Sequence, residues 1–277
     1  MNVAHSTSDS PASGAELAKP RGLPRTHYFS LLWFKTYADL RAEAARTYLN
    51  FLWWIVEPVL YMAVFYVVFG VLFKRGDGPE YVPFLLCGLA VWKWFDSTLR
   101  AGANAIQMNA ALIGQVFVPK AFFPSVTIAQ NLVKYVVVLA ILLIFLQFYG
   151  PGVNTSYLAL PLVVFVQFLF ITGCTFLLAA IVPFMPDILQ MVNYALTLLL
   201  FLSGIFYSVD TFPDHYQIFF ALNPMVEIIE SYRDVLLYER WPDFGALALV
   251  AGVSLLIGGL GLWIMARFER VYPRVVL

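Results

Sequence analysis

The chain has little charge for its length. Of its 277 residues, 12% are Asp, Glu, Lys or Arg, whereas 61% are hydrophobic. Ordinary soluble domains contain about 45–50% apolar residues, so the composition excludes a soluble domain and predicts a membrane protein with several spans. The formal net charge is zero, and without a basic surface no nucleic-acid partner is expected. Both cysteines lie within apolar segments, where they need no disulfide.

Motifs for nucleotide binding and catalysis are missing as well. No glycine is followed by lysine, so the chain has no phosphate-binding loop for ATP. His5 and His27 precede the first predicted span and His215 lies on the opposite side of the membrane, so they cannot share a site. No His-x-x-Glu-His or Gly-x-Ser-x-Gly sequence occurs. We therefore predict a protein that is not an enzyme and carries no catalytic residues, metal site or cofactor.

Long apolar segments dominate the rest of the sequence. Residues 1–26 have no apolar core of the kind that a signal peptide requires, and we expect a disordered cytosolic tail. A span needs about 20 apolar residues. Six segments satisfy this condition, near residues 53–73, 82–101, 125–149, 157–182, 188–208 and 244–266. The sequence thus predicts an all-α integral membrane protein in which residues 27–277 form one transmembrane domain.

The distribution of basic residues predicts the orientation. Eleven of them lie in or beside the segments on the side of the two termini, and four lie on the other side. By the positive-inside rule both termini are cytoplasmic. The segment 102–124 is then cytosolic, and the segment between the fifth and sixth spans faces outward.

Two segments outside the spans have the periodicity of amphipathic helices. Residues 28–49 place aromatic residues on one face and charged residues on the other, which is typical of a helix lying flat in the inner interface; a soluble cytosolic helix is the alternative. From Met225 to Leu236, apolar residues recur at i, i+3, i+4 and i+7. This second helix is too polar to cross the membrane.

Charged residues within the first three spans predict a cluster. Glu57, Lys93, Asp96 and Lys134 all fall in the cytosolic half of the membrane. Charges are expensive there and usually face a partner or a watery cavity, so we expect these four to neutralise one another. The alternative is that the two lysines extend to the headgroups on their own.

Aromatic and amide side chains give weaker signals. Aromatic residues on the faces of two predicted spans are candidates to line a sugar path, although most membrane aromatics simply pack against lipid or helices; they are Tyr61, Phe65, Phe69, Tyr194 and Phe201. In the cytosolic segment 102–124, a helix around 103–113 would present amides to a cytosolic partner, namely Asn104, Gln107 and Asn109.

Four sequences, in this order, resemble the membrane subunit of type-2 ABC exporters: RTYLNFLWWIVEPVLYM, CGLAVWKWF, NAALIGQVFVPKAFFP and NPMVEIIESYRDVLL. They extend over most of residues 30–240. The likeness is closest to the polysaccharide-export branch (the Wzm, KpsM and TagG type), which moves O-antigen, capsule or teichoic acid.

The resemblance implies a permease of the bacterial inner membrane that works as a homodimer with two ATP-binding cassette subunits. ATP and Mg would bind the partner subunits, and 102–124 would be the coupling loop. The substrate would be a polysaccharide on a lipid diphosphate, met by the interfacial helix acting as a gate helix. The phosphates of the lipid diphosphate would contact Arg41, Arg46 and Lys120. Relatives often carry an arginine cluster before the first span, whereas this chain reads RAEAAR.

The resemblance also implies a role for the outer segment 212–238. Backbone that does not span survives at membrane depth only where it lines protein or a water-filled cavity. Two half-helices broken before Pro224 would form a re-entrant pair closing the outer mouth, with Pro224, Glu227, Ile229 and Arg233 in the lid. Two alternatives stay open: a type-2 ABC exporter of a small hydrophobic compound, and an intramembrane polyprenyl-phosphate transferase.

Overall fold

The computed structural model describes residues 25–45, 81–113, 118–150, 152–213 and 222–276, with residue 220 and scattered positions between 52 and 72. Its helices are α1 (Arg25–Ala45), α3 (Tyr81–Ala103), α4 (Ala105–Met108), α5 (Ala110–Ile113), α6 (Phe122–Tyr149), η3 (Thr155–Ala159), α7 (Leu160–Ile181), α8 (Asp187–Leu202), η4 (Val209–Thr211), α10 (Pro224–Leu236), α11 (Phe244–Arg267) and α12 (Tyr272–Val276). Within these residues all regular structure is helical, which confirms the all-α prediction. Most of the predicted first span lies outside the described residues.

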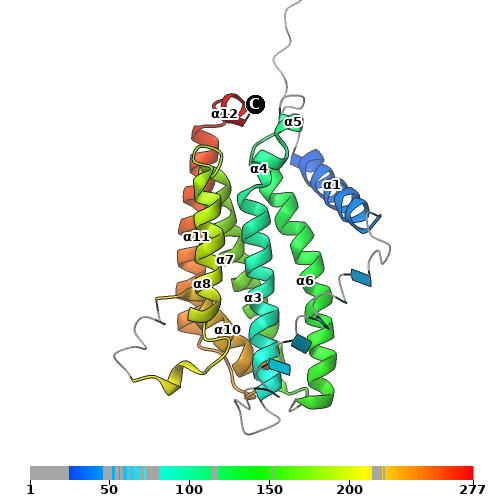
Figure 1. Cartoon of the computed structure of the whole chain (residues 1–277), viewed down its shortest axis with the longest axis vertical. Helices are drawn as coiled ribbons and strands as arrows, with labels where there is room; N and C mark the ends of the chain where they lie inside the picture. The colour runs from blue at the N-terminus through cyan, green and yellow to red at the C-terminus, as the bar shows by residue number, and fades with distance from the viewer. Residues whose placement is uncertain are drawn as a thin grey trace, which may run out of the picture.

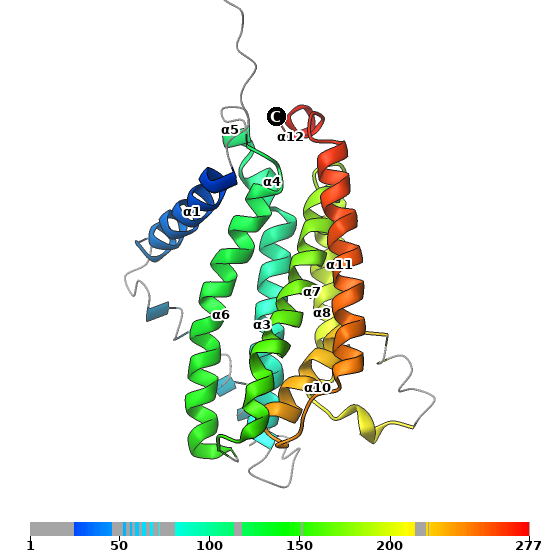
Figure 2. The same ribbon diagram turned by 180° about the vertical axis from the view of Figure 1, so that it is seen from behind.

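The long helices form a bundle. Helices α3, α6, α7, α8 and α11 run along the long axis of the molecule in both views (Figures 1 and 2). Helix α10 lies across one end, hereafter the α10 end. The short helices α4, α5 and α12 lie at the opposite end, the α12 end, and α1 lies obliquely beside α6 near that end (Figure 1). The bundle therefore has two distinct ends joined by continuous helices.

Within the described part of the chain, three helical stretches are long and apolar enough to cross a membrane: α6, the run Thr155–Ile181 and α11. Helix α3 has the length of a span but includes Lys93, Asp96 and Arg100. Helix α8 is apolar and shorter. It ends at Leu202, before the end of the predicted fifth span, because Gly204 adopts a positive φ of 67° and turns the chain.

Glycine residues allow α7 and α11 to pack closely against each other. A Cβ atom on Gly173 would lie 2.5 Å from the carbonyl oxygen of Ser254, and one on Gly261 would lie 2.6 Å from the backbone nitrogen of Leu177. Neither neighbour is a side chain that can move aside. The two backbones therefore touch only because these positions lack side chains, as is common between membrane helices.

Candidate functional site

Helix α10 is built into the bundle by its apolar face. Asn223 caps it, accepting a hydrogen bond from the backbone N–H of Met225 at 3.1 Å, and Pro224 occupies the first turn. The residues of the predicted apolar stripe are at most 1% exposed: Met225, Ile228, Ile229, Tyr232, Val235 and Leu236. They contact α3 and α7. Of the predicted outer residues, Ile229 is thus fully buried, whereas Pro224 and Glu227 are partly exposed.

Arg233 fastens α10 to two other segments. Its Nη1 donates to the carbonyl oxygen of Gly204 at 2.8 Å, and its Nη2 donates to that of Ile205 at 3.0 Å. Its guanidinium carbon also lies 3.4 Å from the ring centroid of Phe84 on α3, a cation–π contact. The side chain is only 2% exposed. The buried side chain of Arg233 therefore connects α10 to α3 and to the turn after α8.

A chain of buried hydrogen bonds links α10 to three helices of the bundle. The hydroxyl of Tyr135 on α6 donates to that of Tyr232 on α10 at 2.9 Å. The Tyr232 hydroxyl donates to Oε1 of Gln167 on α7 at 2.7 Å, and Nε2 of Gln167 donates to the carbonyl oxygen of Val91 on α3 at 2.9 Å. Three side chains and one backbone carbonyl are joined in series, so α6, α10, α7 and α3 share one buried polar network.

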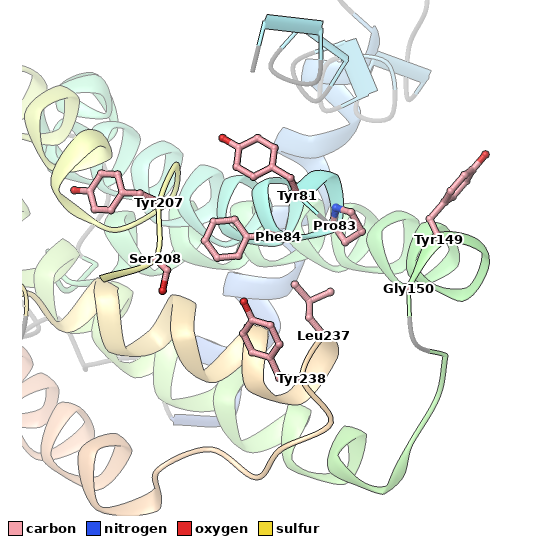
Figure 3. Close-up of a pocket in the computed structure, with 9 residues that line it drawn as sticks. All are labelled: Tyr81, Pro83, Phe84, Tyr149, Gly150, Tyr207, Ser208, Leu237 and Tyr238. Carbon is pink, nitrogen blue, oxygen red and sulfur yellow. The ribbon is translucent and has the colours of Figure 1, made fainter. Parts of the chain in front are cut away.

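A cavity of about 680 Å³ opens at the α10 end (Figure 3). It is lined by the start of α3, the end of α6, the turn after α8 and the end of α10: Tyr81, Pro83, Phe84, Tyr149, Gly150, Tyr207, Ser208, Leu237 and Tyr238. In Figure 3 Phe84, Ser208 and Tyr238 face one another across the space, whereas the ring of Tyr149 points away. The size lies within the range of small-molecule sites, about 300–1,000 Å³.

A second cavity, of about 720 Å³, lies between α1, α3, α4 and α6 toward the α12 end. Polar contacts join α1 to α6 along it. Nζ of Lys134 donates to the carboxylate of Glu43 at 2.6 Å, and Nε2 of Gln130 donates to Asp39 at 3.0 Å. Aromatic residues of α1 such as Trp33 are exposed, whereas the ring of Tyr28 packs edge-on against Phe122 of α6. Helix α1 is thus held beside α6 by two polar contacts and one aromatic contact.

The predicted charge cluster is described only in part. Asp96 accepts a hydrogen bond from Nε of Arg100 at 2.8 Å, one helical turn further on, and Nη1 of Arg100 also donates to Asn193 on α8 at 2.9 Å. Lys134 pairs with Glu43 on α1. Glu57 lies outside the described residues, so a single neutral cluster that includes Lys93 stays a prediction.

The three predicted phosphate contacts differ in accessibility. Arg41 is exposed on α1, and Arg46 lies outside the described residues. Lys120 is only 7% exposed, in the segment between α5 and α6. Burial lowers the pKa of Lys120, and the nearby carboxylate of Glu269 partly opposes this. Among the described residues, Arg41 is therefore the better placed of the two to meet a ligand.

The predicted coupling residues follow directly after the end of α3. Instead of one helix over 103–113, the chain forms α4 and α5 with a break at Asn109, whose side chain donates to the carbonyl oxygen of Ala105 at 2.8 Å. Asn104 precedes α4, and Gln107 lies within it. Both short helices lie at the α12 end, near the C-terminus (Figure 1).

The predicted path aromatics are only partly described. Tyr61, Phe65 and Phe69 lie outside the described residues. Tyr194 and Phe201 on α8 are 70% and 54% exposed, so both lie on the surface of the single subunit.

Sequence reasoning missed the buried network. Gln167 stands alone in the apolar run LPLVVFVQFLF, and a lone amide within a span was a usable signal that a polar partner exists. Its partner Tyr232 lies in a helix far along the chain, which periodicity alone does not identify.

Comparison with known proteins agrees with this architecture. The family model described as ABC-2 type transporter matches residues 31–237, the region from α1 to the end of α10. The chain belongs to the ABC-2 type transporter family. It is 31% identical over 232 residues to the O-antigen export system permease protein RfbA of Myxococcus xanthus, covering 83% of this chain and 89% of that protein.

Two other relatives of this ABC-2 transporter are likewise named as transport proteins. A Klebsiella pneumoniae O-antigen export system permease protein RfbA is 24% identical over 245 residues, covering 88% of this chain and 94% of that protein. The polysialic acid transport protein KpsM of Escherichia coli is 24% identical over 228 residues, covering 79% of this chain and 87% of that protein. The family is one of transporter subunits that cross the membrane, and this chain carries apolar helices of the required length.

Proposed function

We propose that this ABC-2 transporter is the membrane permease of an exporter that moves a lipid-linked polysaccharide, such as O-antigen, out of the cytoplasm. The supporting observation is that relatives named for O-antigen export align with more than four fifths of the chain. The match also includes α10 and the segment before the first span, so it is not confined to generic apolar helices.

The proposed complex is a homodimer of six-span subunits with two ATP-binding cassette subunits, which would bind ATP and Mg. Both termini lie in the cytoplasm of a bacterium, and residues 1–26 form a cytosolic tail before the permease domain at 27–277. The coupling loop 102–124, which includes α4 and α5, would then receive the movement of the ATP-binding subunits. Its position supports this role, because α3 continues from α4 to the α10 end without a break.

We assign the substrate contacts on the same basis. The lipid diphosphate would approach α1, the proposed gate helix, and meet Arg41 and Arg46; Lys120 would become accessible only if the junction between α5 and α6 opened. The glycan would pass along aromatics such as Tyr194 and Phe201 and leave past α10. Because the apolar face of α10 is buried in its own subunit, an outer lid formed by α10 would have to move together with α3.

Purification of the complex tests this function. The chain is co-expressed with its neighbouring ATP-binding subunit in the source bacterium, extracted in mild detergent and analysed for bound lipid by mass spectrometry. We expect a polyprenyl diphosphate that carries repeating sugar units. A bound small hydrophobic compound would favour a drug exporter, and sugar transfer without ATP would favour a transferase.

A further inference from the structure

We propose that the cavity at the α10 end is a carbohydrate-binding subsite that holds sugar rings of the exported glycan on the outer side of the membrane. The inference rests on the proposed function for the identity of the glycan. It concerns a site within one subunit, formed by α3, α10 and the turn after α8, rather than the path along α8.

The walls of the cavity suit a sugar ring. Phe84, Tyr207 and Tyr238 contribute aromatic side chains from three segments of the chain (Figure 3). An aromatic face carries partial negative charge, so it attracts the weakly positive C–H groups on one face of a pyranose ring. Tyr238 is 47% exposed, and its ring is therefore accessible to a ligand.

Three aromatic side chains of the cavity, those of Phe84, Tyr207 and Tyr81, are held by contacts within the subunit. Arg233 packs against the ring of Phe84, with 3.4 Å between the guanidinium carbon and the ring centroid. The hydroxyl of Tyr207 donates to the carbonyl oxygen of Phe201 at 2.6 Å, and that of Tyr81 donates to Phe206 at 3.4 Å. Binding to fixed side chains loses less conformational entropy than binding to mobile ones.

Polar groups beside the cavity distinguish a sugar from a lipid chain. An adjoining pocket of about 180 Å³ shares Phe84, Ser208 and Tyr238 with it and adds four charged residues: Glu230, Arg233, Asp234 and Arg240. A carboxylate has about four acceptor positions, so it can accept sugar hydroxyls besides its existing contacts. An acyl chain in the same place would desolvate these charges without replacing their hydrogen bonds.

The location agrees with a subsite for the emerging product. The cavity is lined by residues of the α10 end, which is the opposite end of the bundle from α4, α5 and α12 (Figure 1). With both termini in the cytoplasm, as proposed above, the α10 end is the outer end. A weak subsite there would hold each emerging sugar segment and hinder backward sliding.

Binding of oligosaccharides to the intact complex tests the inference. The complex with its ATP-binding subunit is placed in nanodiscs and titrated with oligosaccharides released by mild acid from the source bacterium's own surface polysaccharide. Saturation-transfer NMR identifies the sugar protons in contact, and thermophoresis gives Kd. Tyr238→Ala should raise Kd about tenfold, the upper range for loss of one aromatic contact. Tyr238→Phe, which keeps the ring, should raise it less than about threefold.

Two further variants keep the result interpretable. Phe148→Ala removes an aromatic side chain that is 78% exposed at the end of α6 and does not line the cavity, so its Kd should equal that of the wild type. Arg240→Gln changes an exposed residue of the polar pocket and should raise Kd about fivefold even if Tyr238→Ala assembles poorly.

The outcomes separate this inference from the proposed function. A wild-type complex that exports the polysaccharide but binds no oligosaccharide overturns the subsite alone, as does an unchanged Kd in both Tyr238→Ala and Arg240→Gln. A complex that exports no polysaccharide overturns the function on which the subsite rests. If short-chain phospholipid displaced the oligosaccharide, and Phe148→Ala and Tyr238→Ala changed the Kd equally, the cavity would be a lipid site instead.

Discussion

Replacement of Tyr232 by phenylalanine is expected to destabilise the protein far more than the same change at Tyr135. Both tyrosines belong to the buried hydrogen-bond chain and are at most 2% exposed. Tyr135 only donates in this chain, whereas Tyr232 accepts from Tyr135 and donates to Gln167. Tyr135→Phe therefore removes one hydrogen bond, which averages about 0.6 kcal/mol in a membrane protein. The stacking of this ring on Trp94, with centroids 4.1 Å apart, is retained.

Tyr232→Phe leaves two buried groups without partners, the hydroxyl hydrogen of Tyr135 and Oε1 of Gln167. Each unpaired buried group costs about 1–3 kcal/mol, so the free energy of unfolding should fall by about 2–6 kcal/mol. In the double variant Tyr135→Phe, Tyr232→Phe only the Gln167 oxygen is unpaired. The double variant should therefore be more stable than Tyr232→Phe alone, by about 1 kcal/mol or more.

Unfolding of the four proteins in mixed detergent micelles, followed by tryptophan fluorescence as the SDS fraction rises, measures these differences. Correct assembly is checked beforehand by gel filtration. Equal destabilisation by the two single variants, or a double variant whose loss equals the sum of the two, would refute the chain of donors and acceptors described here.

The α7–α11 contact predicts that Gly261→Ala lowers the denaturation temperature by several degrees, because the added Cβ would lie 2.6 Å from the backbone of Leu177. Gly259→Ala should leave it unchanged, because a Cβ there would meet no atom within 4 Å. Equal effects of the two variants in a thermal scan would contradict this. Reversal of the charge at either Glu43 or Lys134 should make α1 more sensitive to proteolysis, and exchange of both charges should restore its protection. A double variant in which α1 is still unprotected would show that the pair does not hold α1. Burial lowers the pKa of Lys120 below the ordinary value of 10.5, so its charge opposes folding at neutral pH. Lys120→Met should therefore raise the denaturation temperature at pH 7, and the gain should shrink as the pH rises toward 10.5, since the native lysine then loses its proton more readily than the unfolded one; a gain independent of pH would contradict this sign.

Local patterns predicted α10 well. The apolar spacing from Met225, the break before Pro224 and the acid Glu227 in the first turn are properties of a short segment, and the structure has the helix and its buried face at those residues. Helix periodicity reports which face is apolar, and burial follows once any apolar neighbour is available. The partner that buries this face was not predictable from the same pattern.

Pairings between distant residues were beyond the sequence. Asp96 pairs with Arg100 at i, i+4, a residue outside the predicted charge cluster that also reaches α8. The contact of Lys134 with Glu43 depends on where α1 packs beside α6, and nothing in either local segment specifies that placement. A ligand-binding role for an exposed residue such as Arg41 was predicted only from the resemblance, because exposure alone does not specify what a side chain binds.

ATP-driven movement of the substrate tests the central claim most directly. The purified complex is reconstituted into vesicles with its ATP-binding subunits facing outward, and the lipid-linked polysaccharide of the source bacterium is added to the outer leaflet. We expect ATP, but not a non-hydrolysable analogue, to carry the glycan into the vesicle lumen, where an added glycosidase no longer cleaves it. Active ATP hydrolysis with the glycan still fully cleaved by the glycosidase would contradict the assignment as a polysaccharide exporter.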